Sequence, residues 1–354
     1  MLLYIHIPFC DSKCHYCAFN SYTDRFHLKH NYMQALIKQL EFELKYLDEK
    51  KEKLQTVFIG GGTPSSVKFE EYKEVFKLIK PYLTENCEIT TEANPNSASI
   101  KWLEGMKSFG VNRVSFGVQS FNNEKLKKLG RSHNNKSAIE AIQNAKNVGF
   151  EKINCDIIYG VQDDSFESLK KDFDMAFSLP INHLSAYSLT IEEGTKFFNK
   201  SNIKIDDEEL SYKIFEYFEK NGFIQYEISN FAKSKEAESK HNYGYWQHKE
   251  YLGVGAGAVG YKNSYRYYPL KGIEEYILTP TKYEIEDLGI EDIKVEKTLL
   301  GFRCSTGVEL SIFNKEELEK INYLVEENKL KLDKYRVFNK NFLLADELAL
   351  YILE

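Results

Sequence analysis

Three cysteines, Cys10, Cys14 and Cys17, lie close together near the start of the chain, in the run HIPFC-DSK-C-HY-C-AF. Such a cluster of thiols is typical of an iron–sulfur loop. A cubane has four irons, so three thiolates hold three of them and leave the fourth open to a small chelating molecule. A structural zinc site of the Cys₃His type, with His6 or His15 as the fourth ligand, fits the same loop. The loop alone leaves both metal sites open.

The composition indicates a globular protein whose cysteines stay reduced. Its 354 residues are 42% hydrophobic and 28% charged, which suits one large domain with a smaller companion. Cys87, Cys155 and Cys304 stand alone in the sequence, and we expect them to be small buried hydrophobes. Three bunched cysteines favour a metal over disulfides, and hence a reducing compartment. The net charge of -6 argues against a nucleic-acid partner.

The chain carries no evident targeting or membrane signal. Leu2, Leu3 and Tyr4 are apolar, but no basic segment precedes them and His6 interrupts the run, unlike in a signal peptide. The weakly polar stretch from residue 251 to 261 is much shorter than the roughly 20 residues that span a bilayer. We therefore expect a cytoplasmic protein with no transmembrane segment.

The elements that must position the cysteines alternate between short β-rich runs and helical patterns. We expect strands at 2–7, 55–59, 87–92, 112–117, 152–159 and 183–189, and helices at 29–49, 69–80, 97–108, 122–129, 135–148 and 165–177. Repeated βα units predict a parallel sheet with right-handed crossovers. Six units predict an α/β fold with an open, partial (β/α)6 barrel.

Beyond the barrel the pattern changes, so three regions are predicted. Residues 1–205 form the barrel. Residues 206–282 begin with a helix at 207–221 and continue as an aromatic and glycine-rich segment, whose run from Gly253 to Ala258 permits close approach of the backbone to a bound molecule or to another strand. Residues 283–354 form a helical, winged-helix-like region, with a short β segment near 329–338 and a final apolar helix from Leu343 to Leu353.

Polar residues and glycines follow the predicted strands where a barrel places its site, at the carboxyl ends. The cysteine loop follows the first strand, Gly60 to Pro64 the second, and Glu92 to Pro95 the third. Each carboxylate in an apolar strand is costly unless it is paired. Glu92 and Asp156 therefore suit an ammonium group and ribose hydroxyls, and Arg131 suits a carboxylate.

These motifs carry a resemblance to a known family. The series YIHIPFC-x₃-C-x₂-C, GGGTP, TEANP, FGVQSF, LGRSH and DIIYG, between Tyr4 and about Thr195, resembles the radical S-adenosylmethionine (SAM) superfamily. The resemblance implies that Cys10, Cys14 and Cys17 hold a 4Fe-4S cluster, whose fourth iron SAM chelates. It also implies SAM contacts at Tyr4, Gly61, Gly62, Thr63, Glu92, Gln119, Arg131 and Asp156. The zinc alternative is correspondingly disfavoured.

Within the superfamily, the chain resembles the group that contains anaerobic coproporphyrinogen III oxidases and HemW heme chaperones. The oxidases use a 5′-deoxyadenosyl radical from SAM to decarboxylate propionate side chains, whereas the chaperones bind heme and pass it on. The oxidases carry a fourth cysteine two positions after the third, where this chain has Phe19, and an N-terminal extension, whereas this chain starts nine residues before Cys10. We therefore expect a heme chaperone, with the oxidase as the alternative. Whether SAM is cleaved, and which residues are catalytic, stays open.

The segment from His241 to Trp246, HNYGYW, matches the HNxxYW motif associated with heme in the chaperone group. A neutral imidazole is a common axial ligand of heme iron, and aromatic rings can cover the macrocycle. His241 is thus the predicted ligand and His248 a weaker second candidate, although a histidine satisfied by core hydrogen bonds fits the same residues. The expected partners are heme, an unidentified heme-acceptor protein and an electron donor for the cluster.

Overall fold

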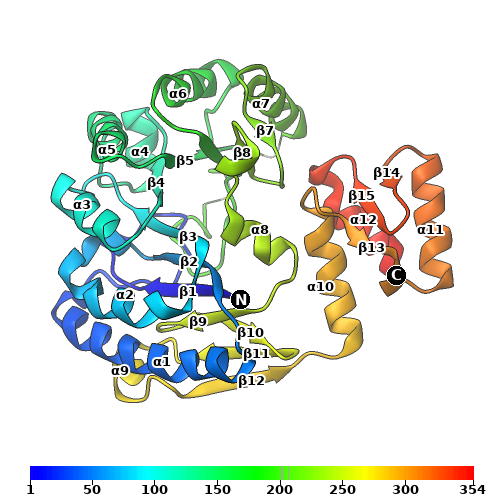
Figure 1. The fold of residues 1–354 in the computed structure, drawn as a ribbon. Helices are drawn as coiled ribbons and strands as arrows, with labels where there is room; N and C mark the ends of the chain where they lie inside the picture. The colour runs from blue at the N-terminus through cyan, green and yellow to red at the C-terminus, as the bar shows by residue number, and fades with distance from the viewer. Residues whose placement is uncertain (201, 206) are drawn as a thin grey trace.

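The computed structural model describes residues 1–200, 202–205 and 207–354 of the chain, so residue 206, where the second predicted region begins, lies outside it. Its centre is a curved sheet whose first six strands are parallel and pair in chain order (Figure 1). These strands are β1 (Leu2–Ile7), β2 (Leu54–Gly61), β3 (Leu83–Ala93), β4 (Arg113–Gln119), β5 (Lys152–Tyr159) and β6 (His183–Ser188). The predicted parallel α/β fold is confirmed.

Helices connect consecutive strands and cover the outer face of the sheet (Figure 1). They are α1 (Lys29–Lys50), α2 (Lys73–Ile79), α3 (Ile100–Ser108), α4 (Asn123–Leu129), α5 (Asn135–Val148), α6 (Phe166–Ser178) and α7 (Glu208–Lys220). The helix predicted at 69–80 is shorter, because residues 69–72 form a 3₁₀ turn before α2 begins. Asn122, Asn134 and Ser165 each cap the start of a helix by accepting backbone N–H groups.

The two faces of the sheet differ in character. In β1, Leu3, Ile5 and Ile7 are fully buried in the main hydrophobic core, while Tyr4 and His6 share the opposite, inner face. Polar residues recur in the inner half of the barrel, among them Thr56, Thr90, Arg113, Ser115, Asn154, His183 and Ser185, all buried. They bond to one another, as where Asn154 Nδ2 donates to Ser115 Oγ at 2.7 Å. The barrel interior is therefore a polar compartment.

Later segments extend the same sheet at both edges. β8 (Asn230–Ala232) and β7 (Ile224–Gln225) add to the β6 edge, and β9 (Tyr251–Val254) pairs in parallel with β1, followed by β10 (Gly260–Lys262), β11 (Tyr265–Pro269) and β12 (Tyr283–Asp287). Helix α9 (Ile273–Leu278) packs against α1. A Cβ on Gly253 would lie 2.1 Å from the Val259 carbonyl oxygen, so this part of the glycine run serves close approach of the chain to itself.

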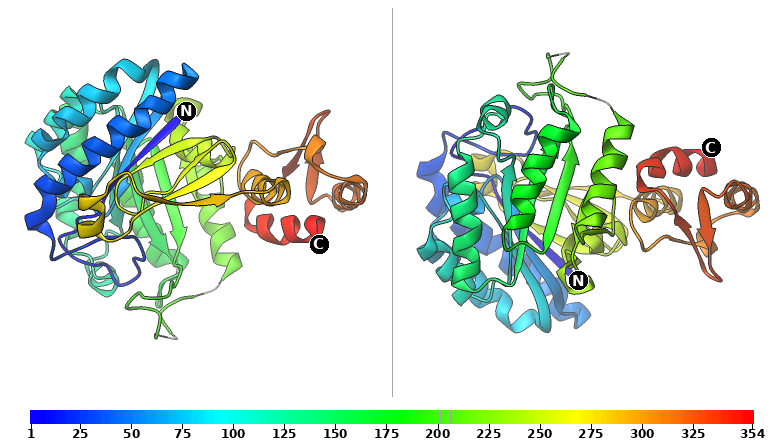
Figure 2. Two further views of the ribbon diagram at one scale, coloured as in Figure 1. Left: turned by 90° about the horizontal axis from the view of Figure 1, so that it is seen from below. Right: turned by 90° about the horizontal axis from the view of Figure 1, so that it is seen from above.

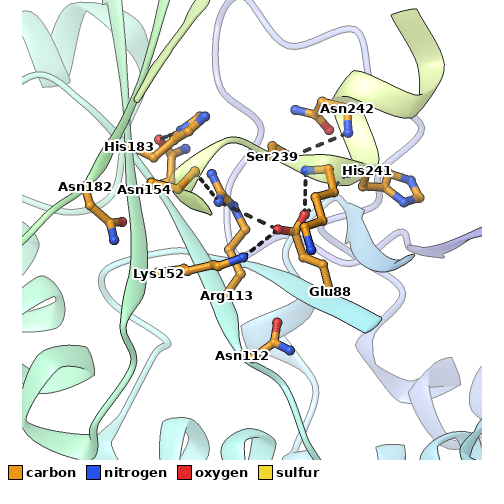
Figure 3. A network of polar contacts seen from close by, with 12 residues as sticks. Glu88, Asn112, Arg113, Lys152, Asn154, Asn182, His183, Ser239, His241 and Asn242 are labelled. Carbon is orange, nitrogen blue, oxygen red and sulfur yellow. Dashed lines mark hydrogen bonds and ion pairs between the residues drawn. The ribbon is translucent and has the colours of Figure 1, made fainter. Parts of the chain in front are cut away.

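Helix α8 (Lys240–Trp246) lies at the amino ends of the parallel strands, where buried charges anchor it (Figure 3). Glu88 Oε1 accepts hydrogen bonds from the backbone N–H groups of Lys240 at 2.8 Å and His241 at 3.4 Å. Glu88 Oε2 lies 3.3 Å from Lys152 Nζ and 4.0 Å from Arg113 Nη1. Arg113 also donates to the Ala237 carbonyl at 2.7 Å. A carboxylate at a helix N-terminus complements the helix dipole, so Glu88 stabilises the start of α8. We call the network of Glu88, Arg113 and Lys152, at the amino end of the barrel, the charged floor.

A smaller unit follows the barrel and has its own hydrophobic core. It contains α10 (Ile290–Phe302), α11 (Lys315–Glu326), α12 (Ala345–Leu353), and a three-stranded sheet of β13 (Val308–Glu309), β15 (Arg336–Asn339) and β14 (Leu330–Leu332). The unit lies beside the barrel, with α10 on the barrel side (Figures 1 and 2). The predicted small C-terminal region of helices and strands is confirmed. None of the described helices combines the length and apolar character needed to cross a membrane.

Candidate functional site

A cavity of about 450 Å³ opens at the carboxyl ends of the parallel strands. Cys10, Cys14 and Cys17 line it together. Seven of the eight other residues predicted to form this site also line it: Gly61, Gly62, Thr63, Glu92, Gln119, Arg131 and Asp156. The cavity lies within the roughly 300–1,000 Å³ range of small-molecule and cofactor sites. These residues, which follow successive strands in the sequence, therefore lie together at the carboxyl end of the sheet.

The cysteine loop is held by contacts within the segment between β1 and α1 and by a contact with the turn after β2. Cys10 N donates to the Tyr22 carbonyl at 3.1 Å, and Cys10 Sγ lies 3.4 Å from Thr63 Oγ1. Lys13 Nζ donates to the Phe19 carbonyl at 2.6 Å and closes the loop from within. All three thiols are free and half-buried, and burial raises the pKa of both Cys10 and Cys17. Metal binding to such thiols releases their protons.

The two histidines considered as zinc ligands have other partners. His6 Nδ1 lies 2.9 Å from the Tyr4 hydroxyl and its Nε2 lies 2.8 Å from the Asn20 carbonyl. His15 Nδ1 lies 3.0 Å from the Lys128 carbonyl. Within the described part of the chain, no three Cys, His, Asp or Glu side chains converge on one ion. In a cubane the three thiolates bind three different irons and need not converge on one ion. The three free thiols that share this cavity therefore fit an iron–sulfur cluster.

His15 has a structural role, because it fixes the cysteine loop to the end of α4. Its backbone N–H donates to the Leu129 carbonyl at 3.0 Å. Gly130 ends the helix at a φ of 75°, and a Cβ there would lie 2.7 Å from the His15 ring. Glycine is required for both reasons. The turn directs the next residue, Arg131, into the cavity.

The glycine turn after β2 brings the backbone close to the cysteine loop. Gly62 N donates to the Ile7 carbonyl at 2.8 Å, and a Cβ on Gly62 would lie 2.9 Å from the Phe9 carbonyl oxygen. Gly61 has a φ of 112° and donates from its N–H to Glu92 Oε2 at 3.0 Å. Side chains at these positions would push strand and loop apart. The turn thus leaves the backbone of β2 facing the cavity.

Two half-buried carboxyl groups, Glu92 on β3 and Asp156 on β5, face the cavity from either side of β4. Burial raises the pKa of Glu92 to about 8, and the nearby Asp156 contributes further. Burial also raises the pKa of Asp156, although hydrogen bonds from Ser185, Asn154 and Ser115 oppose this shift. A cationic ligand would stabilise the ionised form of either carboxyl group. The pair therefore suits an ammonium group and ribose hydroxyls.

Two polar atoms of this cavity are buried without a partner in the described structure. They are Gln119 Oε1 and Arg131 Nε. Gln119 also has a φ of 70°, which is uncommon for a residue other than glycine. Arg131 donates from Nη1 to Cys14 Sγ at 3.3 Å and from Nη2 to the Gly117 carbonyl. Unpaired buried polar groups are costly, so their presence here indicates a polar ligand.

Two tyrosines that were not predicted line the first cavity, and one predicted tyrosine, Tyr4, does not. The hydroxyl of Tyr4 lies 2.9 Å from His6 Nδ1, and both residues line a second cavity. Tyr16 and Tyr187 line the cavity but were not among the predicted site residues. Tyr16 lies inside the cysteine motif, so its position gave a signal. Tyr187 follows the alternation of β6 onto the inner face, a pattern visible only once that strand is in register.

The two histidines considered for heme lie elsewhere. His241 is fully buried beneath the barrel, with Nδ1 2.7 Å from Thr56 Oγ1 and Nε2 3.0 Å from the Tyr245 hydroxyl. Its ring stacks on Phe58 at 5.1 Å. His248 lines a second cavity, and its Nε2 lies 2.8 Å from Glu296 Oε2. In this structure both ring nitrogens of His241 are therefore engaged.

Comparison with known proteins gives consistent matches. The sequence profile of the radical SAM superfamily matches residues 4–176. The chain is 36% identical to the heme chaperone HemW of Bacillus subtilis (strain 168) over 320 residues, which are 86% of this chain and 84% of that protein. It is 35% identical to the heme chaperone HemW of Lactococcus lactis subsp. lactis (strain IL1403) over 355 residues, or 94% and 92%.

A solved structure matches almost the whole fold. It is coproporphyrinogen III oxidase (HemN) from Escherichia coli, described as a radical SAM enzyme. The TM-score is 0.82 at 19% identity, covering 99% of this chain and 89% of that chain. At this identity the likeness shows a shared fold, including the small C-terminal unit, and nothing about activity.

Proposed function

Because this chain belongs to the HemW family of heme chaperones within the radical SAM superfamily, we propose that it binds heme and transfers it to an acceptor protein. The observation that carries the proposal is the identity of 35–36% to two such chaperones over most of both chains. The oxidase shares the fold at 19% identity only. Phe19, where the oxidases have a fourth cysteine, further favours the chaperone.

We propose that the first cavity holds the iron–sulfur cluster and SAM. Cys10, Cys14 and Cys17 would each ligate one iron of the cluster, and SAM would complete the coordination of the fourth iron. The partnerless atoms of Gln119 and Arg131 support a polar ligand at this position. The remaining proposed SAM contacts are Tyr4, Gly61, Gly62, Thr63, Glu92 and Asp156. Tyr4 stays a predicted contact, although it lines the second cavity and not this one.

A bound cluster and SAM would supply one-electron chemistry, which needs an external electron donor. The chain's own residues would hold the thiols at the rim of the barrel and place the half-buried carboxyl groups of Glu92 and Asp156 beside the ligand. Heme carriage itself requires no SAM cleavage. The assignment is therefore a carrier whose cluster site supports heme delivery, in the cytosol, where thiols stay reduced.

The heme-binding part of the proposal involves the segment from His241 to Trp246. Ligation of iron by His241 stays a prediction. It requires a rearrangement, because Nε2 is hydrogen-bonded to Tyr245 and Nδ1 to Thr56. Burial lowers the pKa of His241 to about 3, so its imidazole is neutral, as an iron ligand must be.

One anaerobic experiment separates carrier from oxidase. Reconstituted, reduced protein is incubated with SAM and coproporphyrinogen III, and the products are separated by chromatography. We expect no sustained formation of protoporphyrinogen IX. A parallel titration with heme, followed by absorbance, should show saturable binding with and without the cluster. Multiple turnovers to protoporphyrinogen IX would contradict the carrier proposal and establish the oxidase.

A further inference from the structure

A second cavity, of about 530 Å³, lies between the barrel and the C-terminal unit. The barrel side comes from β1, the end of the cysteine loop, and the segment from α8 to β11. The opposite wall is one face of α10, formed by Glu296, Leu299 and Leu300 at the three- and four-residue spacing of a helix, and by Arg303 directly after its last residue. The cavity is as large as the first one and is built from different residues, apart from Phe19, which lines both.

The walls of this cavity are aromatic and apolar. Tyr245, Tyr251 and Tyr261 line one side, and their rings form a connected series, with 4.7 Å between the centroids of Tyr245 and Tyr251 and 6.3 Å between those of Tyr251 and Tyr261. Leu299 and Leu300 lie opposite and are only half-buried. Half-exposed leucines that face aromatic rings across a cavity suit a flat apolar ligand.

The charged residues of the lining are mainly cations. Lys249, Arg266 and Arg303 face a single carboxylate, Glu296, so the lining carries an excess of two positive charges. Arg266 is paired with Glu296 at 2.6 Å, and Arg303 with Asp346 at 2.6 Å. Lys249 is exposed at the rim and makes no side-chain hydrogen bond or ion pair in the described structure. Such cations are natural partners for carboxylates on a ligand.

We infer that this second cavity is where the tetrapyrrole lies, with its ring between the tyrosines and α10 and its propionates toward Lys249 and Arg303. The inference rests on the proposed heme function and adds its location. The position agrees with the HNxxYW segment, because Tyr245 lines the cavity and contacts His241 from the other side. His248 lines the cavity directly. Shape and charge assign the site, so it binds the porphyrin without iron as well.

Two substitutions test the location. Leu299→Trp fills the space between α10 and the tyrosines, and Lys249→Glu reverses the unpaired charge at the rim. Each has a matched control on the surface away from the cavity, Leu278→Trp and Lys38→Glu, where both side chains are exposed. The ligands are heme, followed by absorbance, and metal-free protoporphyrin IX, followed by fluorescence. Thermal unfolding of each variant reports whether it is folded.

We expect Leu299→Trp to weaken binding of both porphyrins by about tenfold or more, because the larger side chain occupies part of the space that the porphyrin needs and the surrounding residues cannot move aside without cost. Lys249→Glu should weaken it about three- to tenfold, with less dependence on salt, because an attractive charge becomes repulsive. Controls should bind as the unchanged protein does. Folded Leu299→Trp and Lys249→Glu proteins that bind both porphyrins normally would overturn this location but leave the carrier function standing. An unchanged protein that binds no heme would overturn the proposed function.

Discussion

The Nε2 atom of His241 lies 3.0 Å from the Tyr245 hydroxyl, and the Tyr245 ring separates this histidine from the second cavity. The two rings meet edge to face at 4.8 Å. His241 has no exposed surface, while Tyr245 is half-buried. The tyrosine thus covers the imidazole that the motif predicts as an iron ligand, and ligation by His241 requires the hydroxyl to release it.

The Tyr245→Phe substitution tests this cover. It keeps the ring but removes the hydroxyl that occupies Nε2, so an iron bound in the second cavity should gain His241 more readily. We expect heme affinity to rise several-fold and the Soret band to shift toward the histidine-ligated form. The same spectral feature should be lost in His241→Ala. Tyr251→Phe is the control, because Tyr251 lines the cavity and contacts the Tyr245 ring. Identical spectra for all of these proteins would contradict ligation by His241.

The carboxyl group of Glu92 should make the stability of the cluster-free protein depend on pH. Burial raises its pKa in the folded state to about 8, above the ordinary value of 4.5. Between these values the unfolded chain is ionised while the folded chain still holds the proton. The free energy of unfolding should therefore fall as pH rises from about 5 to 8, by about 1.4 kcal/mol for each pKa unit of the shift.

Denaturant unfolding of the unchanged protein and of Glu92→Gln at several pH values measures this dependence. The amide does not ionise, so the two stability curves should separate with rising pH, the glutamine variant becoming relatively more stable. Glu140→Gln, on the surface of α5, is the control and should parallel the unchanged protein. A Glu92→Gln curve parallel to that of the unchanged protein would show that Glu92 has an ordinary pKa.

The charged floor beneath the barrel predicts a large effect on stability (Figure 3). Glu88→Ala leaves the buried Arg113 and the Lys152 ammonium without their carboxylate and removes the acceptor at the start of α8. Removal of one member of a buried ion pair typically costs about 3–5 kcal/mol. We expect a fall of this size in the free energy of unfolding, and a smaller one for Glu88→Gln, which keeps an oxygen acceptor.

The measurement is again chemical denaturation. Glu74→Ala provides the comparison, because its ion pair with Lys77 is exposed and such pairs contribute about 0–1 kcal/mol. If Glu88→Ala proved as mild as Glu74→Ala, the floor network would have no stabilising role. The floor also matters for heme, because it fixes the helix that contains His241 and Tyr245.

The sequence was sufficient for the first cavity because one geometric rule governs it. In a parallel sheet, residues that follow successive strands meet at the same end, so the cysteine loop, the turn at Gly61, Glu92 and Asp156 had to converge. The same reasoning could not find Glu88 and Arg113, which lie on β3 and β4 toward the amino ends of these strands, away from the first cavity. A charged residue at a strand start is also typical of the surface, and only the packing of α8 shows that these are buried.

The second cavity lay beyond sequence reasoning for a different reason. Its walls come from β1, the end of the cysteine loop, the segment from α8 to β11, and α10, so their contact depends on how the C-terminal unit packs against the barrel. No local periodicity reports such a contact. The spacing of Leu299, Leu300 and Arg303 is that of one helical face, but it does not indicate that this face lines a site. His248 was considered as a ligand, yet its ion partner Glu296 lies 48 residues further along the chain.

Phe19 provides the last prediction, since it lines both cavities while its side chain is 68% exposed. An exposed side chain contributes little to stability, so Phe19→Ala should change the free energy of unfolding by no more than about 0.5 kcal/mol. An aromatic ring that stacks on a bound macrocycle is worth about 0.5–1.5 kcal/mol beyond its buried area. Heme affinity should therefore fall about three- to tenfold. The check is a heme titration of cluster-free protein beside Leu278→Ala, whose leucine is 81% exposed and lines neither cavity. Equal heme affinity in the two variants would mean that Phe19 takes no part in binding the porphyrin.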